Sequence, residues 1–364
     1  MMEKEDPGPS RANEKAEVRV IGITYNLRRC AAGDEPDDRY EEYDCIETVQ
    51  SLKDTIEAFG FKVVLLEQND FFFDALRQTK PDFIVNIAEG LGVMRGRESQ
   101  VPAILESLGI PYAGSDSVAC ALALDKWLTH HMLVSAGLPV PTLFMFSEEG
   151  DLWTQGQIFS HHREYIVKPR WEGSSKGVFA DSVVRTHAEL AERVSRIWER
   201  YRQPAIVEEY LPGIEITVGV LGNRPPQVIG LMAVNPEPTD DGHSFYTLEH
   251  KRNWEQKVRY APPEALSEEI RLSVSRDAVR CFQFLELKDI ARIDFKLDRW
   301  GVPKIIDVNP LPGLSETYSD LPILYRLSGG RYEELVRSLL SEAFARYGLS
   351  WPYLVEVKLP YAEY

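Results

Sequence analysis

The sequence has few cysteines and no long apolar run. Its four cysteines (Cys30, Cys45, Cys120 and Cys281) lie far apart and form no CxxC pair. This spacing argues against a zinc site or a disulfide framework, and it favours reduced thiols in an intracellular protein. No uninterrupted apolar stretch approaches the roughly 18–20 residues of a membrane-spanning helix, and the charged N-terminus lacks the apolar core of a secretory signal. We therefore expect a cytoplasmic protein.

An excess of positive charge is also missing. The chain has 41 Lys and Arg against 57 Asp and Glu, a formal net charge of −16. Nucleic acids and anionic membranes are bound by clustered basic residues, so we expect neither as a partner. A small anionic ligand is still allowed, because it needs only a few cations inside a cleft. The hydrophobic fraction of 44% is typical of a folded protein, and the length of 364 residues suggests about two or three domains.

The N-terminal part predicts alternating strands and helices. Residues 1–17 are charged and contain proline and glycine, which predicts a disordered tail. Apolar runs at 18–24, 62–66 and 83–87 predict buried strands. The segment 44–59 has the apolar spacing of an amphipathic helix. This order predicts an α/β fold with a parallel sheet, whose ligands gather beyond the carboxyl ends of the strands.

The rest of the chain predicts a mixture of strands and helices. Helices are expected over 117–137, 186–201, 264–285 and 331–346. Strands are expected over 165–169, 205–210, 215–221, 227–233, 291–297 and 304–308. There is no internal repeat and no low-complexity tract.

Two acidic residues interrupt apolar strands on either side of a predicted hairpin. If these strands pair antiparallel, Asp294 and Asp307 fall on one face, with Asn309 beside them. Two carboxylates and an amide oxygen are hard ligands suited to Mg²⁺; taken alone, they could equally be acids that cap turns. Arg292 shares the face of Asp294 and could stabilise an oxyanion or a phosphoryl oxygen, or it could form a surface ion pair.

Two further segments contain residue types suited to a nucleotide. The loop 172–177 (EGSSKG) is rich in glycine and serine and follows a strand that carries Lys168. Small residues let backbone N–H groups approach phosphate oxygens, but this loop is neither a P-loop nor a GxGxxG fingerprint. The segment 208–215 could be a hinge that holds an adenosine. Each segment alone could be only a turn.

Taken in order, these motifs resemble the ATP-grasp superfamily and, within it, the D-alanine–D-alanine ligase family. The resemblance covers about residues 18–326. The matching motifs are GIPYAGS at 109–115, ALDK at 123–126, VKP at 167–169, EGSS at 172–175, the hinge 208–215, RID at 292–294, and DVNP with PG at 307–313. It implies an ATP-grasp fold with four parts: a tail (1–17), an N-terminal parallel-sheet (Rossmann-like) domain (18–124), a small central lobe (125–211), and a C-terminal lobe (212–364). The two lobes would clamp ATP.

The family's reaction implies roles for individual residues. Its ligases join a carboxylate to an amine through an acyl-phosphate, with ATP and two Mg²⁺ ions, which Mn²⁺ could replace. By resemblance, ATP would be bound by Lys126, Lys168, Ser174, Ser175, Glu208, Glu209, Leu211, Glu215 and Lys251. The metal ligands would be Asp294, Asp307 and Asn309. The catalytic residues would be Arg292, Ser174, Lys251 and Gly313.

The substrate region departs from the family pattern. The acid for the first substrate's ammonium aligns near Asp44, with Glu42 and Glu47 as alternatives, and Glu98 would orient that substrate. Asn86–Gly90 (NIAEG) replaces the usual histidine–glycine turn. Arg252 takes the place of a tyrosine that bonds the closure loop, and Ser315 and Tyr318 lie at the predicted site for the second carboxylate. These departures make strict D-alanine dimer synthesis doubtful.

We therefore expect an ADP-forming ligase that joins two amino acids, or an amino acid and a related small acid, in a homodimer. Substrate stereochemistry stays open, as does the choice between a cell-wall and a specialised-metabolite role. The alternatives are a regulatory or non-catalytic nucleotide-binding protein and an ATP-dependent phosphotransferase. The C-terminal extension 351–364 has no predicted function.

Overall fold

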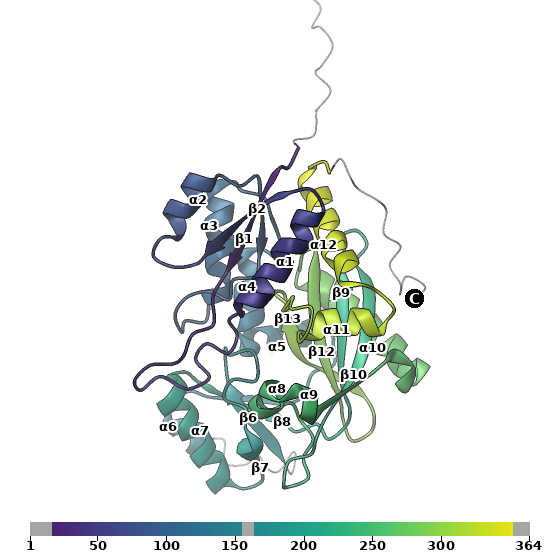
Figure 1. Cartoon of the computed structure of the whole chain (residues 1–364). Coiled ribbons are helices and arrows are strands. Elements are labelled where there is room, and N and C mark those ends of the chain that lie inside the picture. Colours follow the sequence, from purple (N-terminus) through teal and green to yellow (C-terminus); the bar gives the residue numbers. More distant parts are fainter. Residues whose placement is uncertain (1–16, 155–163, 352–364) are drawn as a thin grey trace, which may run out of the picture.

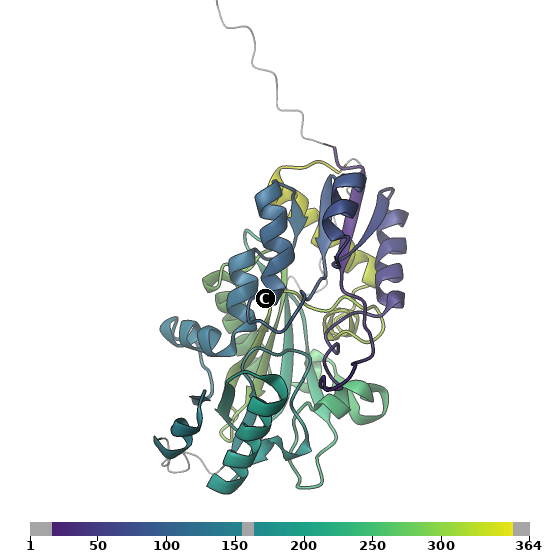
Figure 2. The same ribbon diagram turned by 90° about the vertical axis from the view of Figure 1, so that its left-hand side faces the viewer.

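The computed structural model describes residues 17–154 and 164–351, which form three β-sheets (Figures 1 and 2). Apart from Glu17 and Trp351, the predicted tail and the C-terminal extension lie outside these residues. Within the described ranges, no helix is both long and apolar enough to cross a membrane. The predicted domain boundaries stay predictions, but the sheets show which segments pack together.

The N-terminal sheet is parallel, as predicted, with strand order β2-β1-β3-β4. Its strands are β1 (Val20–Tyr25), β2 (Lys62–Glu67), β3 (Phe83–Asn86) and β4 (Tyr112–Ala113). Its helices are α1 (Ile46–Ala58), α2 (Phe72–Thr79), η1 (Arg97–Ser99) and α3 (Gln100–Leu108). The apolar spacing predicted α1 correctly, because the helix buries Val49, Leu52 and Ile56 against the sheet.

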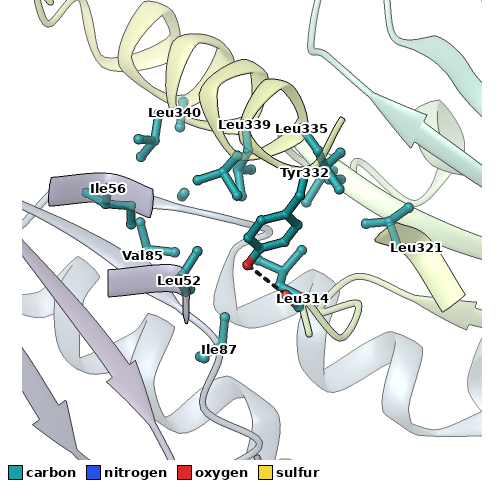
Figure 3. Packing of buried hydrophobic residues seen from close by; sticks show 14 of the residues in the cluster. Leu52, Ile56, Val85, Ile87, Leu314, Leu321, Tyr332, Leu335, Leu339 and Leu340 are labelled. Atoms are coloured by element: carbon teal, nitrogen blue, oxygen red, sulfur yellow. Dashed lines mark hydrogen bonds between the residues drawn. The ribbon is translucent and has the colours of Figure 1, made fainter. Parts of the chain in front are cut away.

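The last helix of the described chain packs on this first sheet. Leu335 and Leu339 of α12 (Tyr332–Tyr347) share one core with Leu52 of α1 and Val85 of β3 (Figure 3). The hydroxyl of Tyr332 donates a hydrogen bond to the carbonyl of Leu314, 2.9 Å away, so the buried phenol is satisfied. The beginning and the end of the described chain therefore form a single hydrophobic core.

A small antiparallel sheet lies at the opposite end of the molecule (Figures 1 and 2), with order β5-β8-β6-β7. The strands are β5 (Leu143–Phe146), β6 (Tyr165–Pro169), β7 (Val183–Val184) and β8 (Ala205–Glu209). The associated helices are α6 (Glu149–Thr154), η3 (Ala180–Ser182) and α7 (His187–Tyr201). Val194 and Ile197 of α7 pack with Val167 of β6 in a core of their own. We call this part the small lobe.

The third sheet is antiparallel and lies between the other two, with order β11-β10-β9-β12-β13. Its strands are β9 (Glu215–Leu221), β10 (Gln227–Pro236), β11 (Val258–Ala261), β12 (Ile290–Leu297) and β13 (Pro303–Asn309). The helices of this region are α8 (Leu248–Arg252), α9 (Trp254–Lys257), η4 (Pro263–Ala265), α10 (Glu268–Phe284) and α11 (Asp320–Leu327).

One predicted helix is wrong in its continuity. The segment 117–137 forms two helices, α4 (Ser117–Leu124) and α5 (Lys126–Ser135), separated at Asp125. Asp125 has extended backbone angles, and its carboxylate accepts a hydrogen bond from the N–H of Leu128, which caps α5. The same carboxylate pairs with Arg170, with the closest atoms 2.7 Å apart. The local cap and the ion pair therefore override the continuous apolar pattern.

Candidate active site

The hairpin of β12 and β13 brings the three predicted metal ligands together. Asp294 lies directly opposite Asp307 in the antiparallel register, and Arg292 lies opposite Asn309. The side-chain amide of Asn309 donates to Oδ2 of Asp294 at 3.0 Å. Because two carboxylates and one amide oxygen meet here, the donor set fits a hard divalent cation such as Mg²⁺.

Two cations, one on β12 itself and one on α5, already contact these carboxylates. Arg292, two residues before Asp294 on the same face, places Nη2 2.9 Å from Oδ2 of that residue. Lys126, at the start of α5, places Nζ 3.0 Å from Oδ1 of Asp307. Burial disfavours the charge on Lys126, but Asp307 outweighs it and the pKa of the lysine is raised. Each of the two hairpin carboxylates therefore has a cation within 3.0 Å.

The predicted hinge residues line a cavity between the small lobe and the five-stranded sheet. Lys168 on β6 pairs with Glu208 on β8 at 2.8 Å. Glu209 pairs with Lys304 at 2.8 Å, and Glu215 lies 3.6 Å from Lys296. The lining includes Lys126, Lys168, Ser174, Ser175, Glu208, Glu209, Leu211, Glu215, Lys251, Arg292, Asp294 and Asp307. We call this space, of about 1030 Å³, the nucleotide cavity.

The glycine-rich loop closes one side of this cavity in a constrained conformation. Ser174 and Ser175 both have positive φ, +53° and +56°, which is uncommon for residues other than glycine. Nζ of Lys251 donates to the hydroxyl of Ser174 at 2.9 Å, and the hydroxyl of Ser175 donates to the carbonyl of Tyr246 at 3.0 Å. These bonds hold the loop against the segment that leads into α8.

A second cavity, of about 1080 Å³, adjoins the first. Its lining includes three residues predicted to contact the substrates (Asp44, Glu98 and Tyr318) and the four predicted to be catalytic (Arg292, Ser174, Lys251 and Gly313). We call it the substrate cavity. Both cavities are lined by Lys126, Gly173, Ser174, Tyr246, Lys251, Arg292, Asp307 and Asp320. The predicted catalytic side chains thus lie where the two spaces meet.

Burial changes the acid strength of the predicted substrate-binding acids. Desolvation raises the pKa of Asp44 to about 7, against the opposing effect of Arg28 and Lys251. It raises the pKa of Glu98 to about 8, although Arg97 opposes the shift. The two alternatives to Asp44 are less suited to the role. Glu47 is exposed and is absent from the cavity lining. Glu42 already forms ion pairs with two cations.

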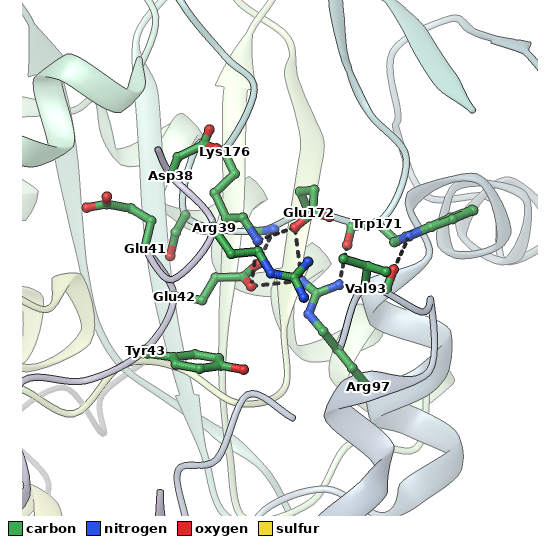
Figure 4. Close-up of polar contacts among 12 residues, drawn as sticks. Asp38, Arg39, Glu41, Glu42, Tyr43, Val93, Arg97, Trp171, Glu172 and Lys176 are labelled. Atoms are coloured by element: carbon green, nitrogen blue, oxygen red, sulfur yellow. Dashed lines mark hydrogen bonds and ion pairs between the residues drawn. The ribbon is translucent and has the colours of Figure 1, made fainter. Parts of the chain in front are cut away.

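Those cations belong to a buried cluster that sequence reasoning missed (Figure 4). Both Oε atoms of Glu42 lie 2.8 Å from Nη2 of Arg97, and Nζ of Lys176 lies 3.2 Å from Oε2 of Glu42. Glu172 contacts both Arg97, at 3.3 Å, and Lys176. The cluster fixes the acidic loop (Gly33–Glu42) and η1 to the glycine-rich loop. Nothing in the sequence marks it, because these charges lie far apart in the chain.

Two predicted substrate residues do not line either cavity. The guanidinium of Arg252 pairs with Glu41 at 2.8 Å and with Asp37 at 3.3 Å, so it holds the acidic loop instead of facing the cavities. Ser315 is 3% exposed, and its hydroxyl bonds to Thr317 at 3.3 Å. The family resemblance placed both residues at the substrates. In the structure, ion pairs hold the side chain of Arg252 on the acidic loop, and a local hydrogen bond holds that of Ser315 against Thr317.

Asp320 is a further cavity residue that the sequence did not single out. Its carboxylate accepts a hydrogen bond from the hydroxyl of Tyr260 at 3.0 Å and lies 3.8 Å from Arg292. It starts α11 and lines both cavities. An acid in the first turn of a helix is an ordinary feature, so the sequence carried no functional signal here.

Comparison with known proteins places this arrangement in a family. The family model "D-ala D-ala ligase C-terminus" matches residues 132–341. The chain belongs to the D-alanine–D-alanine ligase family. Membership confirms the predicted ATP-grasp fold and the prediction of an ATP-dependent, ADP-forming ligase. Ligases of this family use ATP and a divalent metal ion.

The relatives span most of the chain. A D-alanine–D-alanine ligase of Gluconobacter oxydans is 32% identical and aligns with 75% of this chain and 84% of its own. The uncharacterized protein y4sG of Sinorhizobium fredii is 33% identical over 82% of this chain and 87% of its own. The crystal structure of a D-alanine–D-alanine ligase from Bacillus anthracis complexed with ATP superposes with a TM-score of 0.70 at 20% identity, over 91% of this chain and 98% of the other. At that identity the superposition shows the shared fold.

Proposed function

We propose that the protein joins two amino acids, or an amino acid and a related small acid, at the junction of the two cavities. The observation that carries this proposal is their shared wall. Lys126, Lys251 and Arg292 line both spaces, so a phosphate donor held in the nucleotide cavity would face a carboxylate held in the substrate cavity.

The first step would be attack of a substrate carboxylate oxygen on the terminal phosphorus of ATP, which breaks the bond to the β-phosphate oxygen and releases ADP. This brings negative groups together, and the cations on the shared wall would offset the repulsion and align the reacting oxygens. Lys168 and the hinge residues Glu208, Glu209, Leu211 and Glu215 would hold the rest of the nucleotide. Mg²⁺ bound by Asp294, Asp307 and Asn309 would supply further charge neutralisation at the phosphates.

The second step would be attack of a neutral amine on the carbonyl carbon of the resulting acyl-phosphate, which breaks the bond to phosphate and releases inorganic phosphate and a proton. Arg292 and the backbone N–H at Gly313 would stabilise the oxyanion that forms. Gly313 has no room for a side chain, because a Cβ there would lie 2.7 Å from the hydroxyl of Ser319. Ser174 and Ser175 in the glycine-rich loop would help to exclude water, which would otherwise hydrolyse the acyl-phosphate.

In the substrate cavity, Asp44 would bind the ammonium of the first substrate, and Glu98 would orient it. The hydroxyl of Tyr318, which bonds to Thr48 at 3.0 Å, would contact the second substrate. We further propose a cytoplasmic homodimer, on the basis of the acidic charge and of the family resemblance.

The test is ADP release with pairs of amino acids of both configurations, followed by the mass of the product. The proposal predicts ADP and a condensed product in equal amounts for at least one pair. Absence of ADP with every pair, in spite of measurable ATP binding, would refute it.

A further inference from the structure

The substrate cavity contains three acids that have no partner. Asp44, Glu89 and Glu98 all line it. Within residues 17–154 and 164–351, none of their carboxylates makes a hydrogen bond or an ion pair. Glu98 is only 8% exposed, so an unpartnered polar side chain is almost fully buried against the cavity. A buried polar group without a partner is rare in folded proteins, which points to a ligand that satisfies it.

The remaining acids of the cavity differ, because each already contacts a cation. The described ion pairs are Glu41 with Arg252, Glu42 with Arg97, Asp307 with Lys126, and Asp320 with Arg292. Of the cations that line the cavity, Arg28, Lys126 and Arg292 pair with Glu41, Asp307 and Asp294 respectively. Lys251, the lysine bonded to Ser174, lies on the wall shared with the nucleotide cavity. The three unpartnered acids are thus available to bind a ligand that enters the cavity.

The three acids also disfavour one another's charge. Burial raises the pKa of Glu89 well above its ordinary value, and Glu98, Glu42 and Asp44 raise it further. A bound cation would relieve this repulsion. The single α-ammonium of an amino acid is accounted for by Asp44, with Glu98 beside it under the proposed function. Glu89 has no role there, and it lies in the turn that departs from the family pattern.

We propose that the first amino acid is a diamino acid, and that Glu89, together with Glu98, binds its side-chain ammonium. The inference rests on the proposed function and specifies its substrate class. An amino acid with an uncharged side chain would place an apolar group against the half-buried carboxylate of Glu89, which costs free energy. A second ammonium would instead supply charge-assisted hydrogen bonds.

The experiment compares ornithine with norleucine, and 2,4-diaminobutyrate with norvaline, in both configurations. The two members of each pair have side chains of similar length and differ in charge. Each is offered with ATP and Mg²⁺, alone and together with alanine, and ADP release and product mass are measured. We expect kcat/KM for the diamino acid to exceed that for its neutral counterpart by about 10- to 100-fold, the range of one charge-assisted contact.

The variant Glu89→Gln keeps the shape of the side chain and removes its charge. We expect it to lower kcat/KM for the diamino acid by about 10- to 100-fold, and so to remove the preference for the diamino acid over its neutral counterpart. Glu57→Gln is the matched control, because Glu57 is an exposed acid on α1 that pairs with Lys53 at 2.9 Å. This control should not change the preference.

The outcomes separate this inference from the proposed function. ADP release with neutral amino acids and none with diamino acids would overturn the inference and leave the ligase reaction standing. An equal loss for both substrate types in Glu89→Gln would show a structural role and would also overturn it. If that variant does not fold, the comparison of substrates in the unaltered protein decides. No ADP with any amino acid, charged or neutral, would refute the proposed function itself.

Discussion

Removing Arg97 tests whether the buried ion cluster holds the acidic loop in place. The side chain of Arg97 is 2% exposed and contacts two acids, Glu42 at 2.8 Å and Glu172 at 3.3 Å. It also donates to the carbonyl of Trp171 at 2.7 Å. With Lys176, the cluster has two positive and two negative charges, so it is neutral. The substitution Arg97→Met keeps the apolar part of the side chain and leaves one unbalanced negative charge.

The expected cost follows from that imbalance. Breaking a buried ion pair by removing one partner costs about 3–5 kcal/mol. An exposed pair is worth about 0.2–1 kcal/mol. Arg77→Met is the matched control, because the side chain of Arg77 is 78% exposed and lies 3.8 Å from Asp74. We expect the two substitutions to differ severalfold in their effect on the free energy of unfolding, measured by urea titration with circular dichroism.

The pH dependence gives a second, independent measurement. Burial would raise the pKa of Glu42, but Arg97 and Lys176 hold it well below its usual range. The stability from Glu42 is therefore fully present above its unfolded pKa and is lost progressively as the pH falls from there through the lower folded value. In Arg97→Met we expect the pKa of Glu42 to rise above the unfolded value, so that protonation relieves the lone charge. The destabilisation should shrink between pH 7.5 and 5.5. A cost below about 1 kcal/mol, or one that does not change with pH, would refute the reasoning.

Three further predictions concern turnover. Asp294→Asn should lower kcat at least about 100-fold, as expected for a lost electrostatic contact in the transition state, while circular dichroism stays unchanged; full activity would show that the metal assignment is wrong. Asp44 must be ionised to bind an ammonium, and its pKa is about 7. We therefore expect kcat/KM for the first amino acid to fall about tenfold per pH unit below that value, and Asp44→Asn should abolish this limb of the profile. Because Arg252 pairs with the acidic loop, Arg252→Tyr should leave the preference among second substrates unchanged in competition assays; an altered preference would return Arg252 to the substrate site.

Local sequence patterns predicted most of the secondary structure and the metal-ligand hairpin. The apolar residues around Asp294 and Asp307 predicted two strands joined by a short turn. In such a hairpin the residues that face each other are set by the nearby sequence, so both acids could be placed on one face. The interruption at Asp125 was missed, because the cap that Asp125 gives to α5 interrupts a continuous apolar pattern and is supported by a contact with Arg170, 45 positions away. The same limit applies to the pairing of Arg97 with Glu42 and Glu172, since single charges in a sequence resemble surface residues until the fold removes them from water.

The core shared by α1, the N-terminal sheet and α12 determines which segments depend on one another for burial. Residues from β10 and α11 belong to the same core, whereas the small lobe has a separate one. The first and the last segments of the described chain therefore depend on each other for burial, whereas the small lobe contributes no residue to their core. Removing α12 would strip one face of the N-terminal sheet, although that sheet lies at the other end of the sequence. A fragment whose ends were chosen by sequence order alone would divide this shared core. A fragment that contained only the small lobe would keep the core of that lobe complete.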